Sequence, residues 1–120
     1  MSELMDLLPK AQDAAKNFQA ERLKLQTVFA AILQHLNALE LHVEAQVPAP
    51  YGGTLSYSPN GDKWEIYVNI DGHRFQVVDA RYEHQVIVAE RLSALLVEIC
   101  NNALARAEES RRAVAQVQDL

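Results

Sequence analysis

This chain of 120 residues has little of several features that define common protein classes. Its single cysteine, Cys100, cannot form an internal disulfide, which excludes a disulfide-stabilised scaffold. With only four glycines and four prolines, few turns are expected, and a collagen or a disordered tail is excluded. No uncharged apolar run approaches the roughly 18 residues that a membrane span needs.

An excess of basic residues is also missing. The chain has 11 Lys and Arg residues against 16 Asp and Glu residues, a net charge of −5, and the acidic excess is spread along it. A basic nucleic-acid-binding arm is therefore excluded. The first residues lack the basic segment of a signal peptide, so the cytoplasm is the expected compartment. What remains is one compact acidic domain over residues 1–120, of which 49% are apolar.

Residues 6–46 are predicted to form one long helix. An apolar stripe recurs at alternating steps of three and four residues, with Arg22 as its one exception. Such a repeat, about 3.5 residues long, is typical of a helix packed along its length against another helix, as in a coiled coil. Pro48 and Pro50 end the helix and open a connector over residues 47–53. The stripe comprises Leu8, Ala11, Ala15, Phe18, Arg22, Leu25, Phe29, Ile32, Leu36, Leu39 and Val43.

Residues 54–79 change to a period of two and contain two hairpin signals, Asn60-Gly61 and Asp71-Gly72. The second places Ile70 opposite His73, and the first places Tyr57 opposite Trp64. Together they predict a three-stranded antiparallel meander with one buried face. The residues expected on that face are Leu55, Tyr57, Trp64, Ile66, Val68, Ile70, Phe75 and Val77.

A second long helix is predicted over residues 83–117, apolar from Val86 to Leu104 and polar after Arg106. The fold class is therefore α+β, with the order helix, three strands, helix. A sheet of about 20 Å cannot cover two helices that each exceed about 45 Å. The uncovered stripe predicts a homodimer, intertwined or packed through its helices. The residues expected at the dimer seam are Leu25, Phe29, Ile32, Leu36 and Leu39.

No catalytic, cofactor-binding or metal-binding motif stands out, and the protein is not expected to be an enzyme. His35 and His42 are seven residues apart, whereas a helical zinc pair is commonly four apart. An enzyme would need His73, His84, Asp79 and Cys100 to converge in one pocket, and Cys100 is expected to be a small buried hydrophobe in the middle of a helix. No metal ion or cofactor is therefore predicted.

Aromatic and basic residues outside the predicted core are the candidate partner-binding residues. Tyr67 lies on the polar face of the central predicted strand and Tyr51 in the connector, where exposed aromatic side chains would mark a contact surface. Basic side chains could form local patches that hold phosphates despite the acidic total. The basic candidates are Arg74, Arg106, Arg111 and Arg112.

Two stretches of the chain resemble the YbaB/EbfC family of nucleoid-associated proteins. One runs from Trp64 through Asp71-Gly72 to Asp79, and the other is the helical stretch from Leu95 to Glu109. The resemblance implies a tweezer-shaped homodimer that binds DNA. The chain also resembles the small acidic dimeric chaperones of type III secretion, and it fits an inhibitor of a host protein encoded by a phage or mobile element. The partner besides a second copy is thus either nucleic acid or a host protein.

Overall fold

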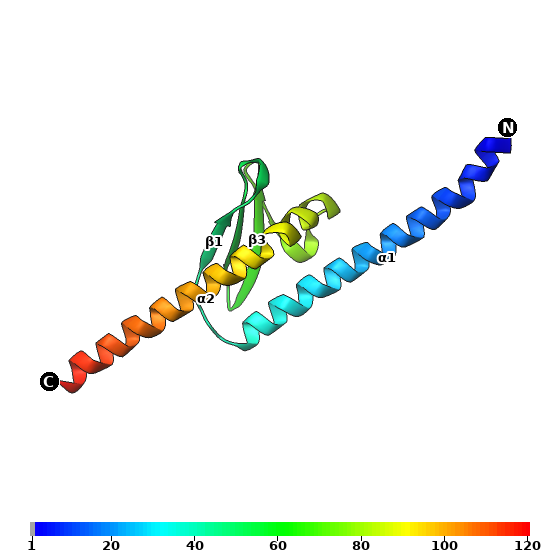
Figure 1. Ribbon diagram of the computed structural model, residues 1–120. Helices are drawn as coiled ribbons and strands as arrows, with labels where there is room; N and C mark the ends of the chain where they lie inside the picture. Colours follow the sequence, from blue (N-terminus) through cyan, green and yellow to red (C-terminus); the bar gives the residue numbers. More distant parts are fainter. Residues whose placement is uncertain (1) are drawn as a thin grey trace.

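The computed structural model describes residues 2–120, which form two long helices and a small sheet (Figure 1). The helices are α1 (Ser2–Ala38) and α2 (Tyr82–Gln118), and the strands are β1 (Ala45–Pro48), β2 (Thr54–Asn60), β3 (Lys63–Ile70) and β4 (His73–Gln76). Two short 3₁₀ turns, η1 (Pro50–Gly52) and η2 (Val77–Asp79), flank the strands. The predicted α+β class is confirmed, with one strand more than expected.

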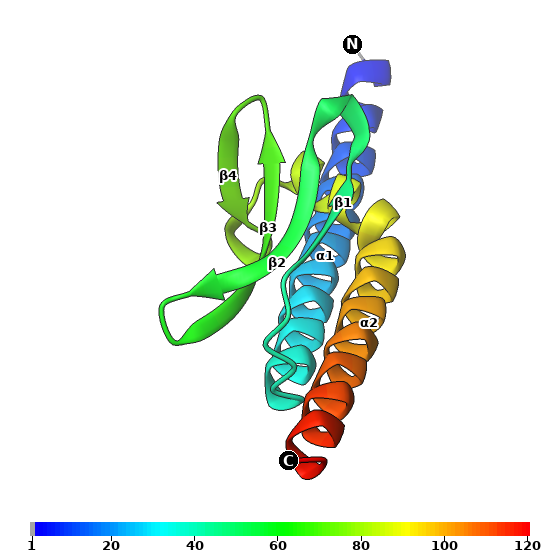
Figure 2. The same ribbon diagram turned by 90° about the vertical axis from the view of Figure 1, so that its left-hand side faces the viewer.

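The four strands form an antiparallel meander in the order β1-β2-β3-β4. Both helices lie on the same side of this sheet, as Figure 2 shows. Helix α2 packs on β1 and β2, and α1 packs on β3 and η2. The opposite side, called here the outer face, is left without a covering helix.

The hairpin predictions are confirmed in one case and shifted in the other. Between β3 and β4, Ile70 lies opposite His73 as expected. Between β2 and β3, Tyr57 lies opposite Ile66, two residues from the predicted partner Trp64. The turn is Gly61-Asp62, because Gly61 is the residue that takes the left-handed backbone there, with φ +64°. A shift of two residues keeps every side chain on its predicted face.

The first helix was predicted to reach residue 46, and this is wrong, since α1 ends at Ala38. Glu40 and His42 both have φ 51°, a left-handed conformation that no α-helix continues through. The following residues alternate between buried and exposed, which is the pattern of the unpredicted strand β1. Val43 thus enters the core from extended chain, while Leu39 is 64% exposed after the end of the helix.

The core lies between the sheet and the central parts of the two helices. Phe29 is 1% exposed, and Leu36 is also buried against the chain's own sheet, so these two predicted seam residues lie inside a single chain. Leu25 and Ile32 are half-buried beside them, and Leu39 lies outside the core. The part of the stripe without an internal partner is therefore the part N-terminal to Phe18, whose ring packs edge-on against that of Tyr82.

Two helical arms extend beyond this core, and among their apolar side chains only Phe18 packs within the chain, with its ring edge-on to that of Tyr82. The α1 arm, residues 3–24, is exposed throughout, and the α2 arm, residues 104–118, is exposed except at Glu108. The molecule measures 87 × 28 × 24 Å, with a radius of gyration of 20.3 Å. A compact chain of this length would have a radius of gyration of about 13.6 Å. The arms account for this elongated shape.

Over residues 2–120, neither helix contains a stretch that is both long and apolar enough to cross a lipid bilayer.

Candidate functional site

Tyr67 was expected to be an exposed contact residue, and the structure corrects this expectation. Its side chain lies on the outer face but is only 8% exposed. The guanidinium of Arg74 lies over the ring, 3.6 Å from its centroid, in a cation–π contact. Arg74 Nη2 also donates a hydrogen bond to Ser58 Oγ at 2.7 Å. A long cross-strand arginine therefore covers the tyrosine, which the alternation of residues could not indicate.

The rest of the outer face is polar and largely paired with itself. Asn69 Nδ2 donates a hydrogen bond to Thr54 Oγ1 at 3.2 Å. At the end of β1 an open pocket of about 510 Å³ is lined by Ser58, Asn69 and Arg74 among others. Its polar atoms are mostly hydroxyl and amide groups, which select a ligand by geometry rather than by charge.

Tyr51 is the tyrosine that the structure leaves exposed. Its side chain is 84% exposed, and its backbone is left-handed at φ 60°, ψ 32°. A bulky residue rarely adopts that conformation, and such strain concentrates at functional positions. The turn is held by a hydrogen bond from Ala49 N–H to Gly53 O at 2.9 Å. Gly53 cannot carry a side chain there, because a Cβ would lie 2.5 Å from the carbonyl oxygen of Asn69.

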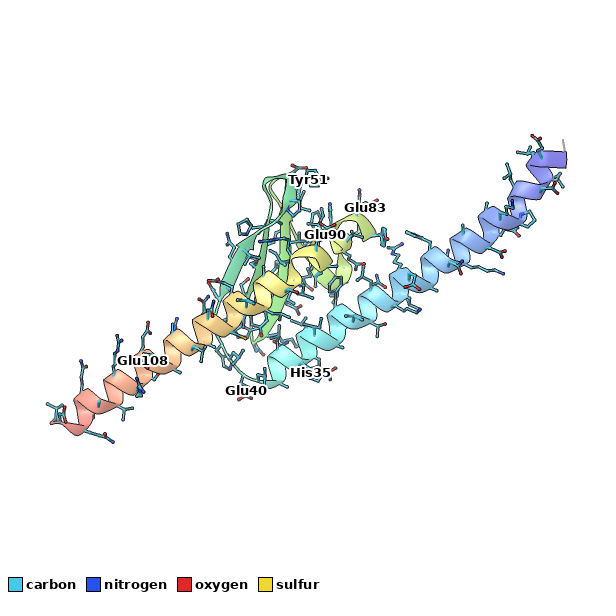
Figure 3. The ribbon with its side chains drawn as sticks, viewed as in Figure 1. His35, Glu40, Tyr51, Glu83, Glu90 and Glu108 are labelled. Atoms are coloured by element: carbon cyan, nitrogen blue, oxygen red, sulfur yellow. The ribbon has the colours of Figure 1, made fainter. Side chains whose placement is uncertain are left out.

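A shallow pocket of about 440 Å³ lies between this turn and the start of α2, and is called here the tyrosine pocket. Figure 3 shows Tyr51 at the end of the sheet, with Glu83 and Glu90 on the neighbouring part of α2. The pocket combines aromatic and aliphatic surface with two carboxylates. Its lining residues are Pro50, Tyr51, Tyr82, Glu83, Val86, Ile87 and Glu90.

The α2 part of the tyrosine pocket was not singled out in the sequence. Glu83, Val86, Ile87 and Glu90 follow the i, i+3, i+4, i+7 spacing of a single helix face, which was the available signal. Nothing in the local sequence shows that the connector with Tyr51 folds back against that face. The pairing of β1 with β2 forms the turn that contains Tyr51, and the packing of α2 on β1 brings that turn to the helix.

The three candidate arginines of the C-terminal part of α2, Arg106, Arg111 and Arg112, do not form one free basic cluster. Arg111 Nη2 lies 2.6 Å from Glu108 Oε1, and Arg112 Nε lies 3.5 Å from the same oxygen. Arg106 lies nearer the sheet and lines a pocket of about 550 Å³ together with Trp64 and Glu109. Two of the three predicted phosphate contacts are thus already paired with a carboxylate.

The candidate catalytic residues converge only in part. His73 and His84 line one pocket on either side of Phe75, with ring centroids 6.2 Å and 5.1 Å from it. Asp79 and Cys100 do not line that pocket, and Cys100 is exposed rather than buried as expected. Within the part of the chain that the structure describes, no three His, Cys, Asp or Glu side chains gather to hold a metal ion.

His35 and His42 do not share a helix face, because α1 ends between them at Ala38. His42 Nδ1 instead accepts a hydrogen bond of 3.1 Å from Trp64 Nε1. Beside it, the hydroxyl of Tyr57 donates to Asn37 Oδ1 at 2.8 Å. These bonds join α1 and the segment after it to the β2–β3 hairpin.

Glu65 is a carboxyl in an unfavourable environment on β3. Burial raises the pKa of its carboxyl above the ordinary value, Lys63 partly offsets this and Asp79 adds to the rise. Oε2 is buried without a hydrogen-bond partner among the residues described. Burial, with a smaller contribution from Glu65, likewise raises the pKa of the Tyr57 hydroxyl. The protonated, uncharged forms of both groups are therefore favoured by the fold.

No protein family model, no curated protein and no solved structure matches this chain.

Proposed function

We propose that this protein is a non-enzymatic homodimer that binds a second protein through the tyrosine pocket. The observation that carries the proposal is Tyr51, held 84% exposed on a left-handed backbone beside an aliphatic and acidic helix face. Exposed aromatic anchors are enriched among the residues that dominate protein–protein binding energy. The homodimer is supported by the two arms, whose apolar side chains other than Phe18 are exposed without a packing partner within one chain.

The chemistry of the pocket favours one kind of partner segment. Tyr82, Val86 and Ile87 offer apolar surface, and Glu83 and Glu90 lie one turn to either side of the aliphatic pair. We expect the partner to insert an apolar side chain flanked by Lys or Arg. Basic side chains placed opposite the two glutamates would then give orientation and a faster association.

The charge distribution favours a protein over nucleic acid. The α1 arm has four basic and four acidic side chains, and residues 104–120 have three of each. Two of those three arginines contact Glu108. Affinity for DNA comes mainly from cations that are free to replace counterions on phosphates. The YbaB-like DNA-binding interpretation therefore lacks an unpaired basic stripe along either arm.

The test compares the intact chain with pocket variants in a capture experiment from host lysate treated with nuclease. We expect one host protein to be retained by the native sequence and lost with Tyr51→Ala and with Glu83→Lys/Glu90→Lys. Lys63→Ala, at the start of β3 and away from the pocket, is the matched control and should retain it. Equal retention by all variants would contradict the role of the pocket.

A DNA titration at increasing salt concentration decides the alternative. Binding that falls steeply with salt and is lost when Arg106, Arg111 and Arg112 become Ala would favour DNA and contradict our proposal. We expect no such binding at physiological ionic strength.

A further inference from the structure

The two arms are helices that need a partner. Leu4, Leu8 and Phe18 on the α1 arm and Val114 and Val117 on the α2 arm are all largely exposed. An isolated helix of about 15 residues is marginal in water, and most helical stability in proteins comes from packing an apolar face. Both arms have such a face, and within one chain only the ring of Phe18 is packed, edge-on against that of Tyr82.

The parts of the two helices that overhang each other match in length and direction. Both helices have 37 residues and run the same way, so that α1 extends past one end of the sheet and α2 past the other (Figures 1 and 2). The rings of Phe18 and Tyr82 are 4.7 Å apart, which places the first turn of α2 level with Phe18. Residues 2–17 and 103–118 are therefore two equal overhangs, each about 24 Å long at 1.5 Å per residue.

We propose that two chains exchange these overhangs, so that each α1 arm packs antiparallel against the α2 arm of a second copy. A two-fold axis perpendicular to the helices, at the middle of the molecule, places each α1 overhang over the α2 overhang of the other chain. Position i of α1 then lies level with about position 120 − i of the partner's α2, given the rise of 1.5 Å per residue. This inference rests on the homodimer proposed above and specifies its geometry.

The apolar stripes of the two arms are continuous with the core. Leu8, Ala11, Ala15 and Phe18 lie on the α1 stripe that leads to the buried Phe29. On α2, the stripe of Leu92 and Ile99 continues through Ala103, Ala107, Val114 and Val117. In a dimer formed by exchange, each apolar stripe would therefore continue from the core of one chain into the contact between the two chains. The same two surfaces would pair at both ends of the dimer, as in an isologous interface.

Cysteine cross-linking of the full chain tests the exchange, in a Cys100→Ala background. Leu4 and Val117 are one position from level between chains, while within one chain they lie near opposite ends of an 87 Å molecule. We expect Leu4→Cys/Val117→Cys to form a disulfide-linked dimer under oxidised glutathione, because a disulfide needs Cα atoms within about 7 Å. Leu4→Cys/Ala103→Cys is the matched control, with its sites about 20 Å apart along the seam, and should stay uncross-linked.

The possible outcomes separate this inference from the proposed function. If light scattering shows a dimer but the Leu4→Cys/Val117→Cys variant does not cross-link, the homodimer stands and the exchange is wrong. Cross-linking by Leu4→Cys alone to the same extent would mean that α1 arms pair with each other, and would also overturn it. A monomer at all concentrations contradicts both.

Discussion

Individual residues show where this fold is under strain. Tyr51 keeps a left-handed backbone, and Glu65 keeps a buried carboxylate oxygen with no donor among the residues described. Both lie on or beside strands whose other residues follow their expected pattern. Departures from local preference of this kind persist only where the surrounding structure enforces them. Two predictions follow from the atoms around such positions.

Glu65 should make stability depend on pH in a defined direction. Because the folded-state pKa of its carboxyl is raised, the unfolded state loses the proton first as the pH rises. Below the unfolded-state pKa of about 4.3 the Glu65 carboxyl is protonated in both states, so it costs no folding stability. Above the folded-state pKa the carboxyl is ionised in both states, and the full loss of folding stability is present. We therefore expect Glu65→Gln to raise the urea midpoint at pH 7 and to leave it unchanged near pH 3. The control Glu44→Gln, at an exposed carboxylate, should change neither, and an equal gain at both pH values would refute this explanation.

Gly53 should be intolerant of any side chain. A Cβ at this position would lie 2.5 Å from the backbone oxygen of Asn69, which cannot move without disturbing β3. We expect Gly53→Ala to lower the free energy of unfolding by about 1–3 kcal/mol, measured by urea denaturation. Gly61→Asn is the control, because its Cβ meets nothing within 4 Å and Asn tolerates a left-handed backbone. A loss at Gly53 no larger than at Gly61 would exclude the close contact as the cause.

At the scale of elements, α1 has two halves with different roles. Its C-terminal half buries Phe29 and Leu36 against the sheet, and its N-terminal half has no contact of that kind. The heptad-like repeat runs through both halves without a change. The sequence pattern therefore predicts packing along the whole helix but cannot say which part packs inside the chain.

A pair of substitutions separates the two halves of α1. Phe29→Ala should lower the free energy of unfolding by about 3–5 kcal/mol at every protein concentration, because Phe29 is fully buried within one chain. Leu8→Ala should leave the stability of dilute protein nearly unchanged and raise the dissociation constant of the dimer. Thermal unfolding at several concentrations measures both effects. If the two substitutions destabilise dilute protein equally, the α1 arm contributes to the stability of the single chain, which would contradict this separation of roles.

At the scale of the whole molecule, the exchange makes a prediction about shape. The two-fold axis superimposes the ends of the two chains, so the dimer should be no longer than the 87 Å of a single chain. Small-angle X-ray scattering on the dimer should give a maximum dimension close to this value, with a doubled cross-section. A maximum dimension well above 87 Å would indicate end-to-end association and contradict the exchange.

Much of the fold could be predicted from local sequence patterns. The two turn signals and the alternation of Leu55, Tyr57, Ile66 and Val68 determined which face of the sheet is buried, and a register error of two residues did not alter it. The boundaries of α2 were also correct to within a residue. Such features depend on neighbouring residues alone, which is why they can be predicted.

The candidate site could be predicted from the sequence only in part. Tyr51 could be named from its place between Pro50 and Gly52, but its neighbours Glu83 and Ile87 belong to a distant part of the chain. Tyr67 was misjudged because the side chain of Arg74, from the next strand, covers it. These are contacts between elements, and no periodicity within one element encodes them.

The sequence by itself determined the α+β class, the buried face of the sheet and the excess helix length, because each arises from periodicity and turn chemistry over a few residues. Only the tertiary structure decided that α1 stops at Ala38, that Ala45 to Pro48 become a strand and that the two helices overhang each other by equal lengths. Those outcomes depend on how much of each helix the sheet can cover. The contacts that compete to cover it come from distant parts of the chain, so no local pattern predicts which of them form.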